Sequence, residues 1–420
     1  MDAIVENQLK SGSLDLVVGI PSYNEADNID FVVRQVAQGL SRYFPDLDTA
    51  IVNSDNFSQD GTREVFLKAD SGKIPKVYLS TPPGVTGKGN NFKNLFKFLA
   101  PYRPQAVMVV DADLRSIRPE WVKGFGQTVF KGYDFVAPLY CRNEYDGTIT
   151  NHLCYPLLYG VLGQDIRQPI GGDFAFSGKL MEHWMAQDWG ENVLRYGVDI
   201  FMTSEAVLSG FSVAQILLGS KIHKPSAPKL GEMFPQVVDT LFRQFLGSRN
   251  LWKMNGEGLE TPPIFKCCNG NERPRLSVDY KTLKQQALKE FSAHKRLILK
   301  ILPPKLGSRI EAMFNSQILR VKAPTWTEIV YSFLRAYASA SDPQKRIKIV
   351  EALKPLYLGR MVFFIRETLE LDHAASEQKL VKQAETFWLQ RRSLLDIQSV
   401  PESGRGKPVA RHQWLNRTDG

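Results

Sequence analysis

The sequence of 420 residues contains few cysteines and no long apolar run. Its cysteines form no CxxC pair, which argues against a structural zinc site, and two adjacent cysteines rarely bridge each other, so we expect reduced thiols. No stretch of about twenty residues is free of charged side chains, and the N-terminal residues lack the basic-then-apolar order of a signal peptide. These absences predict a cytoplasmic protein without a membrane span.

Motifs for nucleic-acid binding are also absent. The formal net charge of +9 comes mainly from the last third of the chain, where basic residues are scattered through helix-like sequence. Neither RNA-binding motifs nor dense Lys/Arg blocks occur there, so we expect no nucleic-acid partner. A solvated face or contact with an acidic partner explains this charge better.

The length exceeds that of a usual single domain, so we expect a catalytic domain followed by an appended one. Residues 246–278 are rich in Gly, Pro, Asn and charge, which predicts a linker. Beyond Tyr280 the apolar pattern is helical. The predicted organisation is a tail over 1–13, an α/β domain over 14–245, the linker, a helical domain over 279–398 and a polar tail over 399–420.

Strand-like and helix-like patterns alternate through the first part of the chain. Apolar, β-branched runs predict strands near 14–20, 49–53, 76–80 and 106–110, with amphipathic helices between them. This order indicates right-handed βαβ units and a mostly parallel, Rossmann-like sheet. Ligands of such sheets bind at the carboxyl ends of the strands, where residues 21–25, Asp55, Lys88 and 111–113 are expected to meet.

Asp111 and Asp113 follow the fourth predicted strand. Two carboxylates this close repel each other and need a compensating cation, and their hard oxygens suit Mg²⁺ or Mn²⁺. The alternative is that both aspartates form a strand-end turn or a helix cap. Their position opposite three other polar loops favours the metal site.

Four further side chains are candidate site residues, and three of them also have a structural interpretation. Lys88 lies between glycines and can place its ammonium on a phosphate, although the Walker pattern is absent. Asp55 either accepts a hydrogen bond from a nucleobase or forms an Asx-turn. Tyr23 either stacks on the base or is a surface tyrosine. Asp199 is either an acid in the first turn of a helix or a carboxylate facing an acceptor hydroxyl.

Three more residues lie on or near loops in the second half of the α/β domain. Arg142 and Thr150 are eight positions apart around a turn and can seat an acceptor carboxylate, although a solvent-exposed arginine is the commoner outcome. His223 follows a predicted strand and precedes a proline. A lone histidine is usually unrelated to metal binding.

Together these motifs resemble a GT-A-fold glycosyltransferase of the family-2 type. The resemblance covers roughly residues 14–230 and rests on PSYNEADN after a strand, a DGT-ended loop, GKG before a helix, DAD after a strand and a late histidine. GVTGKG, QPIGGDFAF, YGVDI, KIHKP and the C-terminal helices are similar to the retaining enzymes that make glucosylglycerate, mannosylglycerate and their 3-phosphoglycerate counterparts. Asp173 stands where those enzymes usually have glutamate.

The resemblance implies a role for each matching residue. Asp111, Asp113 and His223 would hold Mg²⁺ or Mn²⁺, and Lys88 and Asp199 would be catalytic. Arg142, Thr150 and Tyr196 would bind the acceptor. The residues expected to contact the nucleotide sugar are Pro21, Tyr23, Glu25, Asp55, Lys88, Asp111, Ile170 and Gly171.

The activity implied by this resemblance is transfer of glucose or mannose from a GDP- or UDP-sugar to D-glycerate or 3-phosphoglycerate, with retention, to make a compatible solute. We also expect a homo-oligomer formed through the helical C-terminal domain. Two alternatives stay open. One is an inverting transferase acting on a polysaccharide or lipid, and the other is a non-catalytic scaffold that binds sugar nucleotides.

Overall fold

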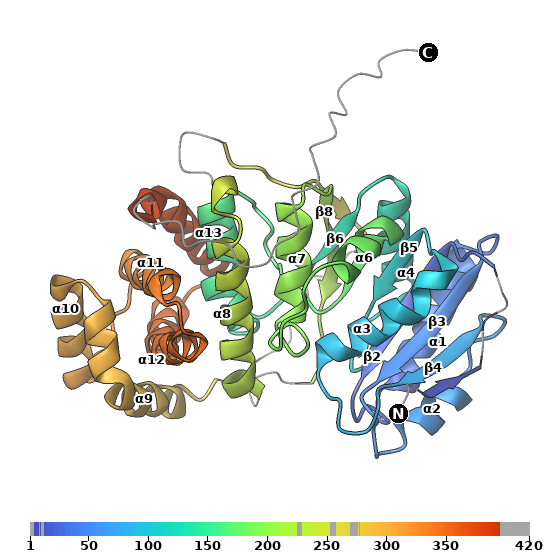
Figure 1. The fold of residues 1–420 in the computed structure, drawn as a ribbon, viewed down its shortest axis with the longest axis horizontal. Coiled ribbons are helices and arrows are strands. Elements are labelled where there is room, and N and C mark those ends of the chain that lie inside the picture. The colour runs from blue at the N-terminus through green and yellow to red at the C-terminus, as the bar shows by residue number, and fades with distance from the viewer. Residues whose placement is uncertain are drawn as a thin grey trace, which may run out of the picture.

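The computed structural model describes residues 4–7, 9, 12–224, 229–252, 258–268, 276 and 278–394. An α/β part lies at one end and the C-terminal helices at the other, with α8 (Leu230–Leu246) between them (Figure 1). The polar tail predicted at 399–420 lies outside the described residues, as do parts of the predicted 1–13 tail and 246–278 linker.

One mixed sheet forms the centre of the α/β part, in the order β1-β4-β3-β2-β5-β7-β6-β8-β9. β2 pairs in parallel with β3 and β5, and β3 pairs in parallel with β4. β7 is antiparallel to both of its neighbours, β5 and β6. The α/β prediction is thereby confirmed. The strands are β1 (Ile4–Glu6), β2 (Leu16–Ser22), β3 (Thr49–Asp55), β4 (Lys76–Ser80), β5 (Ala106–Val109), β6 (Phe135–Cys141), β7 (Phe174–Ser177), β8 (Val213–Ser220) and β9 (Ile264–Lys266).

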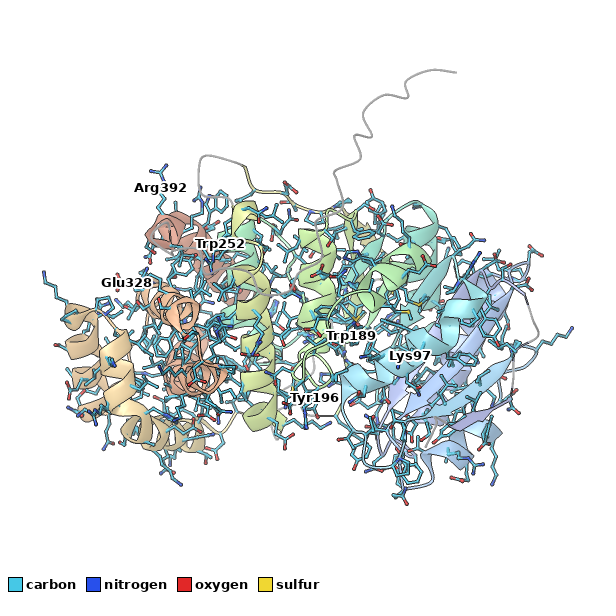
Figure 2. The ribbon with its side chains drawn as sticks, in the orientation of Figure 1. Lys97, Trp189, Tyr196, Trp252, Glu328 and Arg392 are labelled. Atoms are coloured by element: carbon cyan, nitrogen blue, oxygen red, sulfur yellow. The ribbon has the colours of Figure 1, made fainter. Side chains whose placement is uncertain are left out.

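Helices cover both faces of this sheet, as the continuous apolar strands predicted. Val18 packs into the cluster beneath α1 and α4, whereas the adjacent Val17 packs into the cluster beneath α3, α6 and α7. Trp189, labelled in Figure 2, belongs to the second cluster and donates its indole N–H to the Trp184 carbonyl at 2.7 Å. The helices are α1 (Ile29–Tyr43), α2 (Thr62–Lys68), α3 (Lys88–Leu99), α4 (Pro119–Phe130), α6 (Gly178–Met185) and α7 (Val198–Leu208).

Two short edge strands lie in segments predicted to be a tail and a linker. β1 pairs antiparallel with β4, and β9 pairs in parallel with β8. Each has three residues, which is too short for an alternating pattern to appear in the sequence. The sheet therefore extends beyond the strands that the sequence indicates.

The C-terminal residues form a helical region, as predicted. Its core is continuous with that of α8 and of an apolar helical segment at 150–162, which contains α5 (Tyr155–Leu157) between two π-helical turns. Across this junction the Trp326 indole donates to the His152 carbonyl at 2.7 Å, and the Gln383 amide donates to the Asn151 carbonyl at 2.9 Å. The helices are α9 (Tyr280–Ile301), α10 (Pro304–Asn315), α11 (Ala323–Ser339), α12 (Pro343–Thr368) and α13 (His373–Gln390).

Among the described residues, no helix combines the length and the apolar character needed to cross a membrane.

Candidate active site

The predicted polar loops do converge at the carboxyl-end edge of the sheet. Lys88 begins α3, Asp111 follows β5, and Asp199 lies in the first turn of α7. The Lys88 ammonium bridges the other two, at 2.9 Å from Asp111 Oδ1 and 3.2 Å from Asp199 Oδ2. Three segments that are far apart in the sequence therefore meet at one buried ammonium group.

A second lysine, Lys221, which was not predicted as a site residue, completes the cluster. The Lys221 side chain is 2% exposed, and its ammonium lies 3.0 Å from Asp111 Oδ2 and 2.8 Å from Asp173 Oδ2. It also donates to the Gly171 carbonyl at 2.7 Å, and the Tyr140 hydroxyl donates to Asp173. Residue spacing in the sequence cannot predict a buried lysine of this kind, because its carboxylate partners lie far away along the chain.

Close backbone approach makes this packing possible. Gly172 has φ +88°, and a Cβ at this position would lie 2.2 Å from Asp111 Oδ2. Only glycine adopts this conformation readily and leaves room for the carboxylate. The contact with Asp111 therefore explains Gly172. Gly171 is explained by the Pro138 ring, whose Cγ would lie 2.0 Å from a Cβ at that position.

Mutual electrostatics favour the charged forms of Asp111 and Lys88. Burial opposes a charge on Asp111, but Lys88 and Lys221 outweigh burial and hold its pKa well below the usual value. Burial likewise opposes a charge on Lys88, but Asp111 and Asp199 raise its pKa. The pKa of Asp199 is raised by burial and by the Asp111 charge, against the effect of Lys88. Its Oδ1 is buried without a hydrogen-bond partner, so a ligand hydroxyl can bind there.

Asp113 is placed differently from Asp111. Burial and the charge of Asp111 raise its pKa, with Lys221 and His223 acting in the opposite direction. The Lys224 amide donates to its Oδ2 at 3.1 Å. His223 itself pairs with another carboxylate, with Nε2 3.5 Å from Asp146 Oδ2. Within the described ranges, no three His, Cys, Asp or Glu side chains are grouped so that they could hold a metal.

The donor set nevertheless suits a divalent cation in its chemistry. Burial and the nearby Asp111 charge both disfavour a negative charge on Asp113, and a bound cation would compensate the repulsion by Asp111. Carboxylate oxygens and an imidazole nitrogen are ligands that Mn²⁺ and related ions accept. Both oxygens of Asp111 are already paired with lysines, so Asp113 and His223 are the better candidates among the three predicted ligands.

Four of the residues predicted at the nucleotide sugar lie at or just after the ends of β2 and β3: Pro21, Tyr23, Glu25 and Asp55. Tyr23 is 55% exposed, and Glu25 Oε2 pairs with the Lys224 ammonium at 2.8 Å. Pro21 lies inside β2. Asp55 is fully buried and accepts hydrogen bonds from Ser22, Ser58 and Tyr78 side chains and the Ser58 amide. These bonds favour the turn-forming interpretation of Asp55 over contact with a nucleobase.

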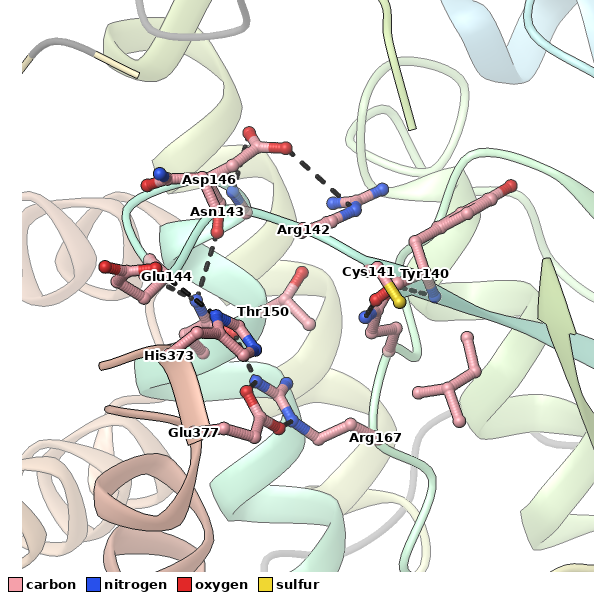
Figure 3. A pocket seen from close by; sticks show the side chains of 14 residues that line it. Tyr140, Cys141, Arg142, Asn143, Glu144, Asp146, Thr150, Arg167, His373 and Glu377 are labelled. Carbon is pink, nitrogen blue, oxygen red and sulfur yellow. Dashed lines mark hydrogen bonds and ion pairs between the residues drawn. The ribbon is translucent and has the colours of Figure 1, made fainter. Parts of the chain in front are cut away.

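A small cavity of about 180 Å³ lies beside the cluster (Figure 3). Arg142 and Thr150 both line it, as the spacing of eight suggested, and the Thr150 hydroxyl is buried without a partner. Arg142 Nη2 donates to the Gly171 carbonyl at 3.2 Å, the same carbonyl that Lys221 contacts. The cavity is therefore linked to the Lys221 cluster through one backbone group.

Tyr196, predicted to bind the acceptor, lies outside this cavity, and Ile170, predicted to contact the nucleotide sugar, stays untested by it. Tyr196 and Ile170 pack against the helical core, and the Tyr196 amide donates to the Gln236 side chain. Neither is among the residues that line the cavity. The cavity wall also includes Arg167, His373 and Glu377, which were not predicted from the sequence. His373 and Glu377 come from α13, more than two hundred residues away from the turn, so no local pattern connects them with it.

Comparisons with known proteins find one matching family model and several similar solved structures. Residues 17–187 match the model of glycosyl transferase family 2. Glucosyl-3-phosphoglycerate synthase from Mycobacterium tuberculosis, in complex with Mn²⁺, uridine-diphosphate and phosphoglyceric acid, is 24% identical over 55% of this chain and 78% of that one, with a TM-score of 0.44. A mycobacterial protein is 26% identical over 55% and 74%, with a TM-score of 0.43. No curated protein matches the chain.

Proposed function

We propose that the glycosyl transferase family 2 domain of this chain moves a hexose from a nucleoside-diphosphate sugar to a small hydroxy acid, D-glycerate or 3-phosphoglycerate, with retention. The observation that carries the proposal is the meeting of Lys88, Asp111 and Asp199 at the sheet edge, beside a cavity lined by Arg142 and Thr150. A donor at the edge and an acceptor in the cavity would then face each other.

The charges at the sheet edge would account for binding of the donor diphosphate. Lys88 is held protonated, and its ammonium lies where diphosphate oxygens would replace the carboxylates as partners. Asp113 and His223 would hold Mg²⁺ or Mn²⁺, which neutralises charge on the leaving diphosphate. Lys221 keeps Asp111 fixed from the opposite side, so Asp111 can orient the sugar.

The cavity lined by Arg142 and Thr150 would account for binding of the acceptor. The Arg142 guanidinium suits a carboxylate, and the unpartnered Thr150 hydroxyl can hydrogen-bond the same ligand. At about 180 Å³ the cavity is smaller than the roughly 300–1,000 Å³ of drug-sized pockets, which supports a small acceptor over a polysaccharide. Asp199 Oδ1 can orient a sugar hydroxyl. For retention, the departing phosphate takes the proton of the attacking hydroxyl.

A donor and acceptor panel tests this function. GDP-glucose, UDP-glucose and GDP-mannose are each combined with D-glycerate, 3-phosphoglycerate or D-lactate, with and without Mg²⁺ or Mn²⁺. We expect metal-dependent transfer to a small hydroxy acid and an α-glycoside by NMR. A β-glycoside from an α-donor rules out retention, and no transfer to any of the three acids rejects the proposed acceptor class.

A further inference from the structure

The cavity that holds Arg142 and Thr150 is closed by the C-terminal helical region. His373 begins α13, and Glu377 lies one turn later, so both side chains project into the cavity wall (Figure 3). His373 Nδ1 lies 3.3 Å from Glu144 Oε2, which belongs to the turn after β6. Residues from α13 thus help to set the charge that an acceptor encounters.

Arg167 is the second guanidinium of the cavity, and Glu377 neutralises it. Arg167 Nε donates to Glu377 Oε1 at 2.5 Å and Nη2 donates to Oε2 at 3.0 Å, which is a bidentate pair. Nη2 also donates to Asn151 Oδ1 at 3.0 Å, while Nη1 is buried without a hydrogen-bond partner. This guanidinium is oriented toward the cavity, but its charge is compensated.

Arg142 is paired with a carboxylate at a longer distance than Arg167 is. Its Nε lies 3.9 Å from Asp146 Oδ2, beyond hydrogen-bond distance, and that carboxylate is shared with His223. The cavity therefore offers one weakly paired guanidinium while presenting carboxylates from Glu144, Asp146 and Glu377. One carboxylate of a ligand can be compensated there. A phosphoryl group, which adds about 1.5 to 2 negative charges, would instead be repelled.

We propose that Glu377 makes this cavity select a monoanionic hydroxy acid over its phosphorylated counterpart, by pairing with Arg167 and withholding that guanidinium from a phosphate. The inference rests on the proposed function, because it takes the cavity as the acceptor site. Glu377 acts here through Arg167, so it is a positioning and selectivity residue.

Calorimetric titration of the full chain with D-glycerate and with 3-phosphoglycerate, in the presence of Mn²⁺ and nucleoside diphosphate, tests selection without requiring turnover. We expect wild type to bind glycerate at least tenfold more tightly than 3-phosphoglycerate. Glu377→Gln should shrink this ratio at least tenfold, because Arg167 becomes available to the phosphate. Adding Arg167→Gln should restore the preference for glycerate. Glu144→Gln should shift the ratio in the same direction as Glu377→Gln.

Glu191→Gln is the matched control, since the Glu191 side chain is 85% exposed and pairs only distantly with Arg195. It should leave the ratio unchanged. A wild type that prefers 3-phosphoglycerate, an unchanged ratio in Glu377→Gln, or no binding of either acid overturns the inference. Selective binding without transfer to either acid rejects the proposed function alone, whereas transfer with an unaltered ratio rejects the selectivity role alone.

Discussion

Lys88 lies at the centre of the candidate site, between Asp111 and Asp199. Its ammonium is buried among carboxylates, and burial would discharge it if Asp111 and Asp199 did not raise its pKa. Those carboxylates in turn depend on the lysine for compensation, because an unpaired buried charge is costly. A negatively charged ligand that reaches Lys88 would exchange one set of anionic partners for another.

Replacement of Lys88 should therefore reduce turnover strongly. We expect Lys88→Gln to lower kcat by about 10²- to 10³-fold, the loss usual for removal of one electrostatic donor to a developing charge. Lys97→Gln, an exposed position on the same helix (labelled in Figure 2), should leave kcat unchanged. Thermal unfolding of both variants separates a catalytic loss from misfolding. Equal kcat values for both variants would show that Lys88 has no part in the reaction.

At this scale the sequence predicted the residues that follow strands but missed the residues that support them. Asp111, Lys88 and Asp199 were accessible to prediction because their positions after a strand or at a helix start fix where they lie. Lys221 and Glu377 were not, because their roles depend on tertiary contacts with Asp173 and Arg167. Asp55 illustrates the reverse case, in which a carboxylate of the right type at the end of β3 is fully buried and already accepts hydrogen bonds from Ser58 and other neighbours.

At the scale of elements, the helical segment at 150–162 joins the two parts of the molecule. Its residue His152 is fully buried beneath α12 and α13, with its ring 4.9 Å from that of Phe364 and its Nδ1 3.3 Å from the Gln383 amide. Burial, with the Arg360 charge, lowers the pKa of His152 well below 6.5. The junction therefore requires a neutral imidazole.

This requirement predicts a loss of stability in mild acid. In the unfolded chain His152 gains a proton as the pH falls below about 6.5, whereas the folded chain does not, so the free energy of unfolding decreases there by up to about 1.4 kcal/mol per pH unit. Denaturant unfolding between about pH 5 and 7 measures the slope. His152→Asn should flatten it, and the control His294→Asn on α9 should not. A slope equal in wild type and His152→Asn would contradict the assignment.

The long strands and helices were predicted better than the short edge strands and the π-helical turns. Long apolar runs with clear periodicity, such as β2 and α3, appear where expected, because both faces of the sheet and one face of the helix are buried. The edge strands β1 and β9 and the π-helical turns have no distinct pattern. Their conformations are set by the strands and helices on which they pack.

At the scale of the whole molecule, the active-site edge belongs to the α/β part while one wall of the cavity belongs to the helical part. The shared core makes this arrangement rigid, since α8 and the segment at 150–162 pack into the same cluster as α9–α12. Under the proposed function, changes in the C-terminal helices would therefore alter acceptor binding without touching the donor site. The predicted assembly through this region stays a prediction.

The central claim is that the Asp111 and Asp113 edge binds a nucleoside diphosphate together with a divalent cation. The most direct measurement is calorimetric titration of wild type, Asp113→Ala and the exposed control Asp46→Ala with UDP and GDP, with and without Mn²⁺. The account predicts that wild type and Asp46→Ala bind one of the nucleotides only when Mn²⁺ is present, and that Asp113→Ala loses at least tenfold in affinity. Equal, metal-independent nucleotide binding by all three proteins would contradict it.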